Sequence, residues 1–266
     1  MAGAIPLFLG VGALAGFLAG LFGVGGGVVI VPMLVLVFGR QGVGESHLMH
    51  LALGTSLASI VFTSISSFSA HHRRGAVVWD AVRRIAPGIL AGTFAGAFIA
   101  ARLRTGPLRV FFVAFLALVI WQLLSDRRPE PARDLPGPAG MTAAGAGIGV
   151  VSSLVGIGGG SLSVPFLIWC NIPPHRAVGT SAAIGFPIAV AGAVGYLANG
   201  WAVPGLPPYS AGYVSLPALA GIAVASVLTA PLGARLAHAL PVRGLKRAFA
   251  LFLIVMAARM AWGVLR

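Results

Sequence analysis

The chain has 266 residues, of which 58% are hydrophobic and only 9% are charged, and its mean hydropathy is +0.97. Soluble domains carry about 25% charged residues, so this composition excludes a soluble globular protein and indicates a polytopic membrane protein. The net charge of +13 does not indicate a nucleic-acid partner, because the basic residues lie in short connections between apolar runs rather than on one soluble face.

The first predicted element is an apolar span over residues 4–22, which leads into a glycine-rich loop ending Gly25-Gly26-Gly27. Each glycine costs about 1 kcal/mol in a helix interior relative to alanine, so three in a row predict a break in the helix. The next apolar segment, residues 28–38, would be roughly 16 Å long as a helix and cannot cross a hydrocarbon core of about 30 Å alone. We therefore predict a broken or re-entrant element with its glycine loop near mid-depth.

Four further elements complete the first half of the chain. They are a span rich in Ser and Thr, an Arg-rich interfacial stretch and two apolar spans, at residues 48–70, 71–84, 85–101 and 108–124. Residues 125–138 hold four prolines and six charged residues and are predicted to be an exposed cytoplasmic linker. We accordingly divide the chain into a first membrane repeat (1–124), this linker, and a second membrane repeat (139–266).

The glycine loop returns 133 positions later, which is half the length of the chain. The second loop runs from Gly156 to Gly160 and is followed by Pro165, as the first loop is followed by Pro32. The segments of this half are predicted at residues 139–155, 161–170, 177–198, 213–236 and 245–264. Interrupted hydrophobic segments at matching places in two halves are the usual sequence pointer to the binding site of a transporter. The alternative is that the glycines only let helices approach closely.

Each half contains five membrane segments when the short ones count as crossings, and an odd number inverts the second copy. Twelve of the 18 Lys and Arg residues lie in connections that this topology puts on one side, at residues 71–84, 125–138, 171–176 and 235–247. Cytoplasmic loops carry an excess of basic residues, so these connections are predicted to face the cytoplasm. The predicted fold is an all-α polytopic membrane protein of two inverted five-segment repeats, with the second segment of each repeat short or broken.

The acidic residues all lie in connections or in the linker, and none lies in a predicted span. This distribution excludes carboxylate proton relays and favours an anionic substrate. Both short segments begin directly after glycines, where a helix N-terminus offers free N–H groups to an anion. The predicted substrate-binding residues are these glycines and the hydroxyl, imidazole and guanidinium groups that follow them: Gly25, Gly26, Gly27, His50, Thr55, Ser56, Gly158, Gly159, Gly160, Ser161, His175, Arg176, Thr180 and Ser181.

Several of these side chains have structural alternatives. The two Thr-Ser pairs either donate hydrogen bonds to substrate or hold helices together, and Ser161 and Ser163 either contact the anion or bond to their own helix. The two histidines are structural hydrogen-bonders, anion ligands or proton carriers near physiological pH. Arg176 is either an anion clamp or an orienting charge. The single cysteine, Cys170, excludes an intrachain disulfide and a metal-thiolate site and is predicted to be a small core residue.

At these residues the sequence resembles the sulfite exporter TauE/SafE family, also called the 4-toluene sulfonate uptake permease family. The resemblance rests on the two glycine loops with their prolines, on Ala-Val-Gly-Thr-Ser at 177–181 with its weaker first-half version, and on Tyr-Val-Ser-Leu-Pro at 213–217. It covers essentially the whole chain. The first half departs from the second at Leu51, where the second half has Arg176, and at Leu53, where it has Val178. This departure argues against strict twofold symmetry of an anion site.

The resemblance implies secondary transport, often export, of sulfur-containing anions such as sulfite, thiosulfate, sulfoacetate or other organosulfonates across a bacterial inner membrane. We expect such a transporter, working by alternating access, with no enzymatic activity, no metal and no cofactor. An anion channel and a non-transporting membrane sensor are the alternatives. Proton coupling, a homodimer, the compound carried and the direction of transport stay open.

Overall fold

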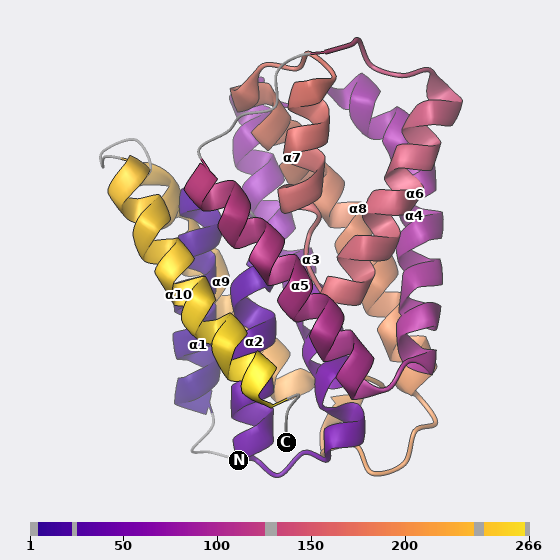
Figure 1. Ribbon diagram of the computed structural model, residues 1–266, viewed down its shortest axis with the longest axis vertical. Helices are drawn as coiled ribbons and strands as arrows, with labels where there is room; N and C mark the ends of the chain where they lie inside the picture. The colour runs from indigo at the N-terminus through magenta and orange to yellow at the C-terminus, as the bar shows by residue number, and fades with distance from the viewer. Residues whose placement is uncertain (1–4, 23–25, 126–131, 237–241, 264–266) are drawn as a thin grey trace.

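The computed structural model describes residues 5–22, 26–125, 132–236 and 242–263 of the chain. Within these ranges the regular structure is ten α-helices and one short hairpin (Figure 1). The elements are α1 (Ile5–Phe22), α2 (Gly27–Arg40), α3 (Glu45–Arg73), α4 (Trp79–Arg102), α5 (Thr105–Ser125), α6 (Pro138–Val155), α7 (Gly160–Trp169), α8 (Pro174–Gly200), β1 (Ser210–Ala211), β2 (Val214–Ser215), α9 (Leu216–Leu236) and α10 (Val242–Trp262). Six of the helices are long and apolar enough to cross a membrane, which confirms the all-helical polytopic class.

The two short segments are helices that start at the glycine loops. Helix α2 has 14 residues and begins at Gly27, and α7 has 10 residues and begins at Gly160. At 1.5 Å per residue they are roughly 21 Å and 15 Å long, both shorter than the hydrocarbon core. In Figure 1, α2 runs back toward the end of the bundle where α1 begins, and α7 runs back toward the end where α6 begins. Gly25 and linker residues 126–131 lie outside the described residues.

Two predicted boundaries differ from the structure. Residues 71–84 are not a separate interfacial stretch, because α3 continues to Arg73 and α4 already begins at Trp79, which leaves only a short turn between them. The span predicted from residue 213 begins as a helix only at Leu216, because the preceding residues form the antiparallel β1–β2 hairpin with Ser210 opposite Ser215. Each of these segments donates one long-range hydrogen bond, from Val78 to Thr180 and from Ser215 to Thr55, which hydropathy does not reveal.

The outer helices form two closely packed pairs, α1 with α9 and α4 with α6. Small residues permit this contact: a methyl group added at Gly12 would lie 2.7 Å from the Ile222 Cα atom, and one added at Gly92 would lie 2.7 Å from the Ala146 Cα atom. Such small-residue contacts are the usual way in which membrane helices approach each other. Helices α3 and α8 pack against each other inside these pairs, so their buried faces line the centre of the bundle.

The five tryptophans mark the two ends of the bundle. Trp79 begins α4, Trp169 ends α7 and Trp121 lies in the last turns of α5, all toward the end formed by the α3–α4 turn (Figure 1). Trp201 follows α8 and Trp262 ends α10 at the opposite end, formed by the α2–α3 turn. All five side chains are exposed. Trp is enriched at both membrane–water interfaces, so the bundle has the aromatic anchors of a membrane-spanning protein.

Candidate site at the two glycine loops

The start of α2 lies against the second glycine loop inside the bundle. Gly27, the first residue of α2, packs on the second loop so closely that a methyl group there would overlap the Gly156 carbonyl oxygen and lie 2.8 Å from the Ile157 Cα atom. Gly156 directly follows α6 and Gly159 directly precedes α7, with φ angles of +69° and +76° that only glycine adopts without strain. The structure therefore brings Gly27 against the second loop, whereas Gly26 faces Ala15 of α1, and Gly26, Gly27, Gly156 and Gly159 are all buried.

Both loops present amide groups at the start of a short helix. Among the described residues, the N–H groups of Gly158 to Ser161 donate no backbone hydrogen bond, whereas Leu162 and Ser163 already donate to the Gly159 carbonyl oxygen. At the start of α2, the N–H groups of Gly27 and Val28 likewise donate to none of the described backbone carbonyls, and Val29 is the first residue shown to donate, to the Gly26 carbonyl oxygen. Helix N-termini with unsatisfied N–H groups attract anions. The arrangement can bind a small anion through backbone alone.

The serines that follow the second loop take different roles. Ser163 donates a hydrogen bond to the Gly159 carbonyl oxygen at 2.9 Å, which is the back-bonding alternative. Ser161 is 7% exposed, and its hydroxyl has no partner among the described residues. A buried hydroxyl without a partner costs free energy, so it is available to a ligand at the start of α7.

Two neighbouring serines belong to the same region and were missed by sequence reasoning. Ser152 and Ser153 end α6, and their carbonyl oxygens accept the N–H groups of Ile157 and Gly156. Both side chains are fully buried, and neither hydroxyl has a partner among the described residues. Tyr196, also fully buried, donates its hydroxyl to the Ser153 carbonyl oxygen at 3.1 Å. The signal was available in the sequence, since these serines immediately precede the loop.

The two Thr-Ser pairs contact the second loop, α7 and two segments far away in the chain. Thr55 accepts the Ser215 N–H and Thr180 accepts the Val78 N–H, each at 2.9 Å. Thr55 on α3 therefore holds the segment that leads into α9, and Thr180 on α8 holds the segment that leads into α4. The serines point to the loop region. Ser56 donates to the Gly156 carbonyl oxygen at 2.7 Å, and Ser181 lies 2.7 Å from the hydroxyl of Ser163, on α7.

The two histidines do not share an environment. His50 is 3% exposed, its Nε2 atom lies 3.0 Å from the carbonyl oxygens of both Ala100 and Leu103, and its ring stacks on Tyr213. These contacts are those of a structural hydrogen-bonder at the end of α4. His175 and Arg176 are exposed in the first turn of α8. The structure thus places His175 and Arg176 at the surface, away from the buried glycine loops.

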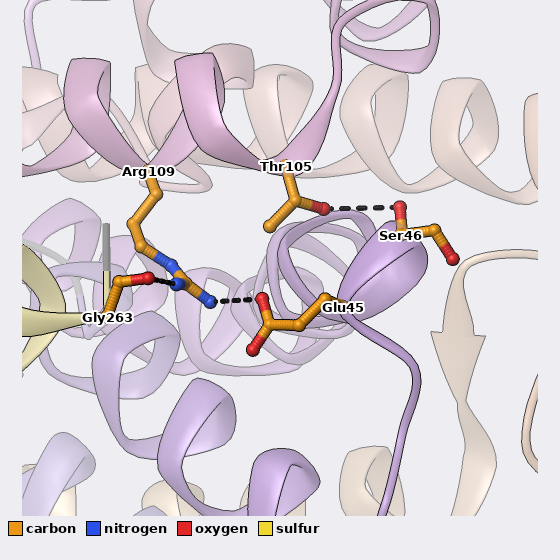
Figure 2. A network of polar contacts seen from close by, with 5 residues as sticks. All are labelled: Glu45, Ser46, Thr105, Arg109 and Gly263. Atoms are coloured by element: carbon orange, nitrogen blue, oxygen red, sulfur yellow. Dashed lines mark hydrogen bonds and ion pairs between the residues drawn. The ribbon is translucent and has the colours of Figure 1, made fainter. Parts of the chain in front are cut away.

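A second polar cluster lies at the α2–α3 end, where Arg109 of α5 is buried (Figure 2). Its guanidinium donates to the Glu45 carboxylate at 2.7 Å and to the Gly263 carbonyl oxygen, so it ties α3 and α5 to the end of α10. Thr105 donates to the Ser46 carbonyl oxygen beside it at 3.1 Å. In the sequence, Arg109 is only one of the six basic residues outside the connections predicted to face the cytoplasm. The structure gives it a partner 64 positions away, which no local pattern predicts.

Comparison with known proteins gives consistent results over the whole bundle. Residues 8–260 match the family model described as Sulfite exporter TauE/SafE. A "Probable membrane transporter protein" of Haemophilus influenzae is 45% identical over 96% of this chain and 97% of its own length. A "Probable membrane transporter protein MJ0441" of Methanocaldococcus jannaschii is 28% identical over 87% of this chain and 86% of its own length. A "Probable membrane transporter protein YunE" of Bacillus subtilis is 30% identical over 71% of this chain and 77% of its own length. No solved structure matches the chain significantly.

Proposed function

The chain belongs to the sulfite exporter TauE/SafE family of membrane transporters, and from this premise we propose that it is a secondary transporter of small sulfur-containing anions, working as an exporter. Sulfite, thiosulfate, sulfoacetate and other organosulfonates are the substrate class. The membrane is the bacterial inner membrane. The protein is a membrane transporter, not an enzyme.

The observation that carries this proposal is the contact of Gly27, at the start of α2, with the second glycine loop. Gly27 packs on the loop that leads into α7, and the buried hydroxyl of Ser161, in the first turn of α7, has no partner among the described residues. Neither glycine-rich stretch contains a charged residue, and no Asp or Glu lies between residues 135 and 266. A sulfonate or sulfite oxygen accepts several N–H and O–H bonds at once, and glycine lets it approach the backbone without a Cβ atom in the way. A cation would find no carboxylate there.

Two inverted repeats, residues 1–124 and 139–266 joined by the linker at 125–138, supply the moving parts in this proposal. The packing of α1 on α9 and of α4 on α6 supports it, because the first and fourth helices of each repeat then pair with those of the other. The basic stretches at 71–84 and 171–176 lie at the same end of the bundle (Figure 1), which supports a cytoplasmic location for that end. Rocking of the repeats around the loops would give alternating access.

The first test is binding and flux with purified protein. Thermal shift against sulfite, thiosulfate, sulfoacetate, taurine and carboxylate analogues identifies the anion, and uptake of that anion into proteoliposomes should saturate with concentration. Ser161→Ala should weaken binding about fivefold to tenfold while leaving the protein folded, because its hydroxyl bonds to no described residue. Ser226→Ala is the matched control, a buried serine on α9 that bonds to its own helix.

The outcomes separate the alternatives. Flux that does not saturate, with single-channel currents, would indicate a channel, and binding without flux would indicate a sensor. Gly159→Val, at a positive φ and with its side chain against Ile188, should abolish flux while the protein still inserts. Normal flux in both Gly159→Val and Ser161→Ala would refute the site at the loops.

A further inference from the structure

A cleft opens on the membrane-facing surface between α1, α2 and α10, separate from the glycine loops. Its volume is about 340 Å³, within the range of pockets that hold small ligands, roughly 300–1,000 Å³. The walls are apolar and come from the first turns of α1, the second half of α2 and the last turns of α10, including Val11, Met33 and Val255. A helix position lacking a side chain, Gly10, forms part of the wall, and a methyl group added there would meet nothing within 4 Å.

Two arginines close one end of this cleft. Arg40 is the last residue of α2 and Arg259 lies in the last turn of α10, and both line the cleft and are exposed. The ion pairs found among the described residues are Arg84–Asp80 and Arg109–Glu45, so neither cleft arginine has an acidic partner there. The cleft therefore combines an unneutralised double positive charge with an apolar interior.

The charge and the apolar walls are ordered along the membrane normal. Helices α2 and α10 both end at the α2–α3 end of the bundle (Figure 1), where exposed Trp262 also lies. The arginines thus lie at the level of the lipid headgroups, and Met33, about two turns earlier on α2 than Arg40, lies toward the hydrocarbon. This order, positive at the interface and apolar below it, matches an anionic amphiphile.

We propose that this cleft binds one anionic phospholipid, with its phosphate between Arg40 and Arg259 and an acyl chain along α1 and α2. Arginine binds phosphate through several N–H groups, and apolar walls exclude a free inorganic anion as the full occupant. A second copy of the chain related by a twofold axis through the cleft would bring like charges together, which disfavours a dimer contact here. The site is independent of the transported anion.

Native mass spectrometry of the detergent-solubilised protein with added phosphatidylglycerol tests this proposal. The wild type should retain phosphatidylglycerol in preference to phosphatidylcholine. The double variant Arg40→Gln/Arg259→Gln should bind phosphatidylglycerol about tenfold more weakly, since two charge-assisted contacts are lost. Gly10→Leu should weaken binding to a similar extent although both arginines remain, because the new side chain fills the cleft.

Matched controls decide whether the cleft itself binds the lipid. Arg104→Gln removes an exposed arginine at the same end of the bundle, and Gly147→Leu adds a side chain in open space on α6; both should bind like the wild type. Equal losses in Arg104→Gln and the double variant would overturn the proposal in favour of general surface charge. Unchanged binding in Gly10→Leu, displacement by inorganic phosphate, or a dimer that is lost in the double variant would also overturn it.

Discussion

The Gly-Thr pairs of the two halves make the same contacts with different parts of the chain. Gly54 packs against the Tyr213 carbonyl oxygen while Thr55 accepts the Ser215 N–H, and Gly179 packs against the Ala76 carbonyl oxygen while Thr180 accepts the Val78 N–H. In each case the carbonyl and the amide belong to residues two apart, in the segment that leads into α9 for the first pair and into α4 for the second. The pair therefore works as a brace for that segment, which supports the helix-holding alternative for both threonines.

Five residues before each threonine, the two halves differ. His50 is buried against the end of α4 and bonds to two carbonyl oxygens, whereas its counterpart His175 is exposed at the start of α8. The contacts of the Gly-Thr pairs are alike in the two halves, whereas the surroundings of the two histidines differ. A residue type that occurs at matching places in both halves is therefore not by itself evidence of a shared function.

The largest expected effect comes from adding a methyl group to either brace. Gly54→Ala and Gly179→Ala each place a Cβ atom against a backbone carbonyl oxygen that cannot move alone, so we expect each to lower the free energy of unfolding in detergent by about 2–3 kcal/mol. Gly147→Ala, where open space surrounds the new group, should be neutral or stabilising. A loss confined to one of the two braces would show that they are not equivalent.

A smaller effect is expected from removing the threonine hydroxyls. Thr55→Val and Thr180→Val keep the shape but leave the N–H groups of Ser215 and Val78 without an acceptor, at a cost of about 1–2 kcal/mol each. Thr→Ser at the same positions keeps the acceptor and serves as the control. Thermal unfolding measured by intrinsic fluorescence should rank the variants in that order. If the Thr→Val and Thr→Ser variants unfold at the same temperature, the hydroxyls do not hold these segments.

The parts of the structure that the sequence predicts are those set by local composition. Three adjacent glycines break a helix wherever they occur, so the starts of α2 and α7 fall within one residue of the predicted segments. The surroundings of His175 and the burial of Arg109 were beyond prediction, because each depends on which distant helix packs beside it. The β1–β2 hairpin was missed for a different reason, since strands of two residues are too short to show periodicity.

The two histidines offer the next test of the comparison. Phenylalanine keeps a flat ring that can stack on Tyr213 but cannot donate to the Ala100 and Leu103 carbonyl oxygens, so His50→Phe should cost about 1 kcal/mol of unfolding free energy. His175→Phe changes an exposed side chain and should stay within about 0.5 kcal/mol of the wild type. Chemical denaturation in detergent measures both. Equal costs would mean that the burial of His50 contributes nothing to stability.

The smallest effect concerns the two residues that directly follow the short helices α2 and α7. They are equivalent in position, but one is exposed and the other is buried. Gln41 caps α2 and is exposed, whereas Cys170 caps α7 and is 2% exposed. The linker closes over this second turn: Ala132 and Arg133 donate their N–H groups to the Trp169 carbonyl oxygen, and the Arg133 guanidinium lies 3.9 Å from the centre of the Trp169 ring. Part of the linker is thus fastened to α7.

Because the linker covers this turn, we predict that the Cys170 thiol reacts slowly. Burial raises the pKa of the Cys170 thiol, and the neighbouring Arg133 offsets only part of that rise, so at pH 7.5 less of it is the reactive thiolate than for an ordinary cysteine with a pKa near 8.5. A maleimide should therefore label Cys170 at least about tenfold more slowly than the exposed thiol of Gln41→Cys/Cys170→Ser in detergent. As the pH rises above about 9, the rate at the exposed position should level off while that of Cys170 continues to increase, because a raised pKa moves its titration to higher pH. Equal rates at pH 7.5 would mean that the linker does not shield α7, and the two short helices would then be alike at this end as they are at their glycine loops.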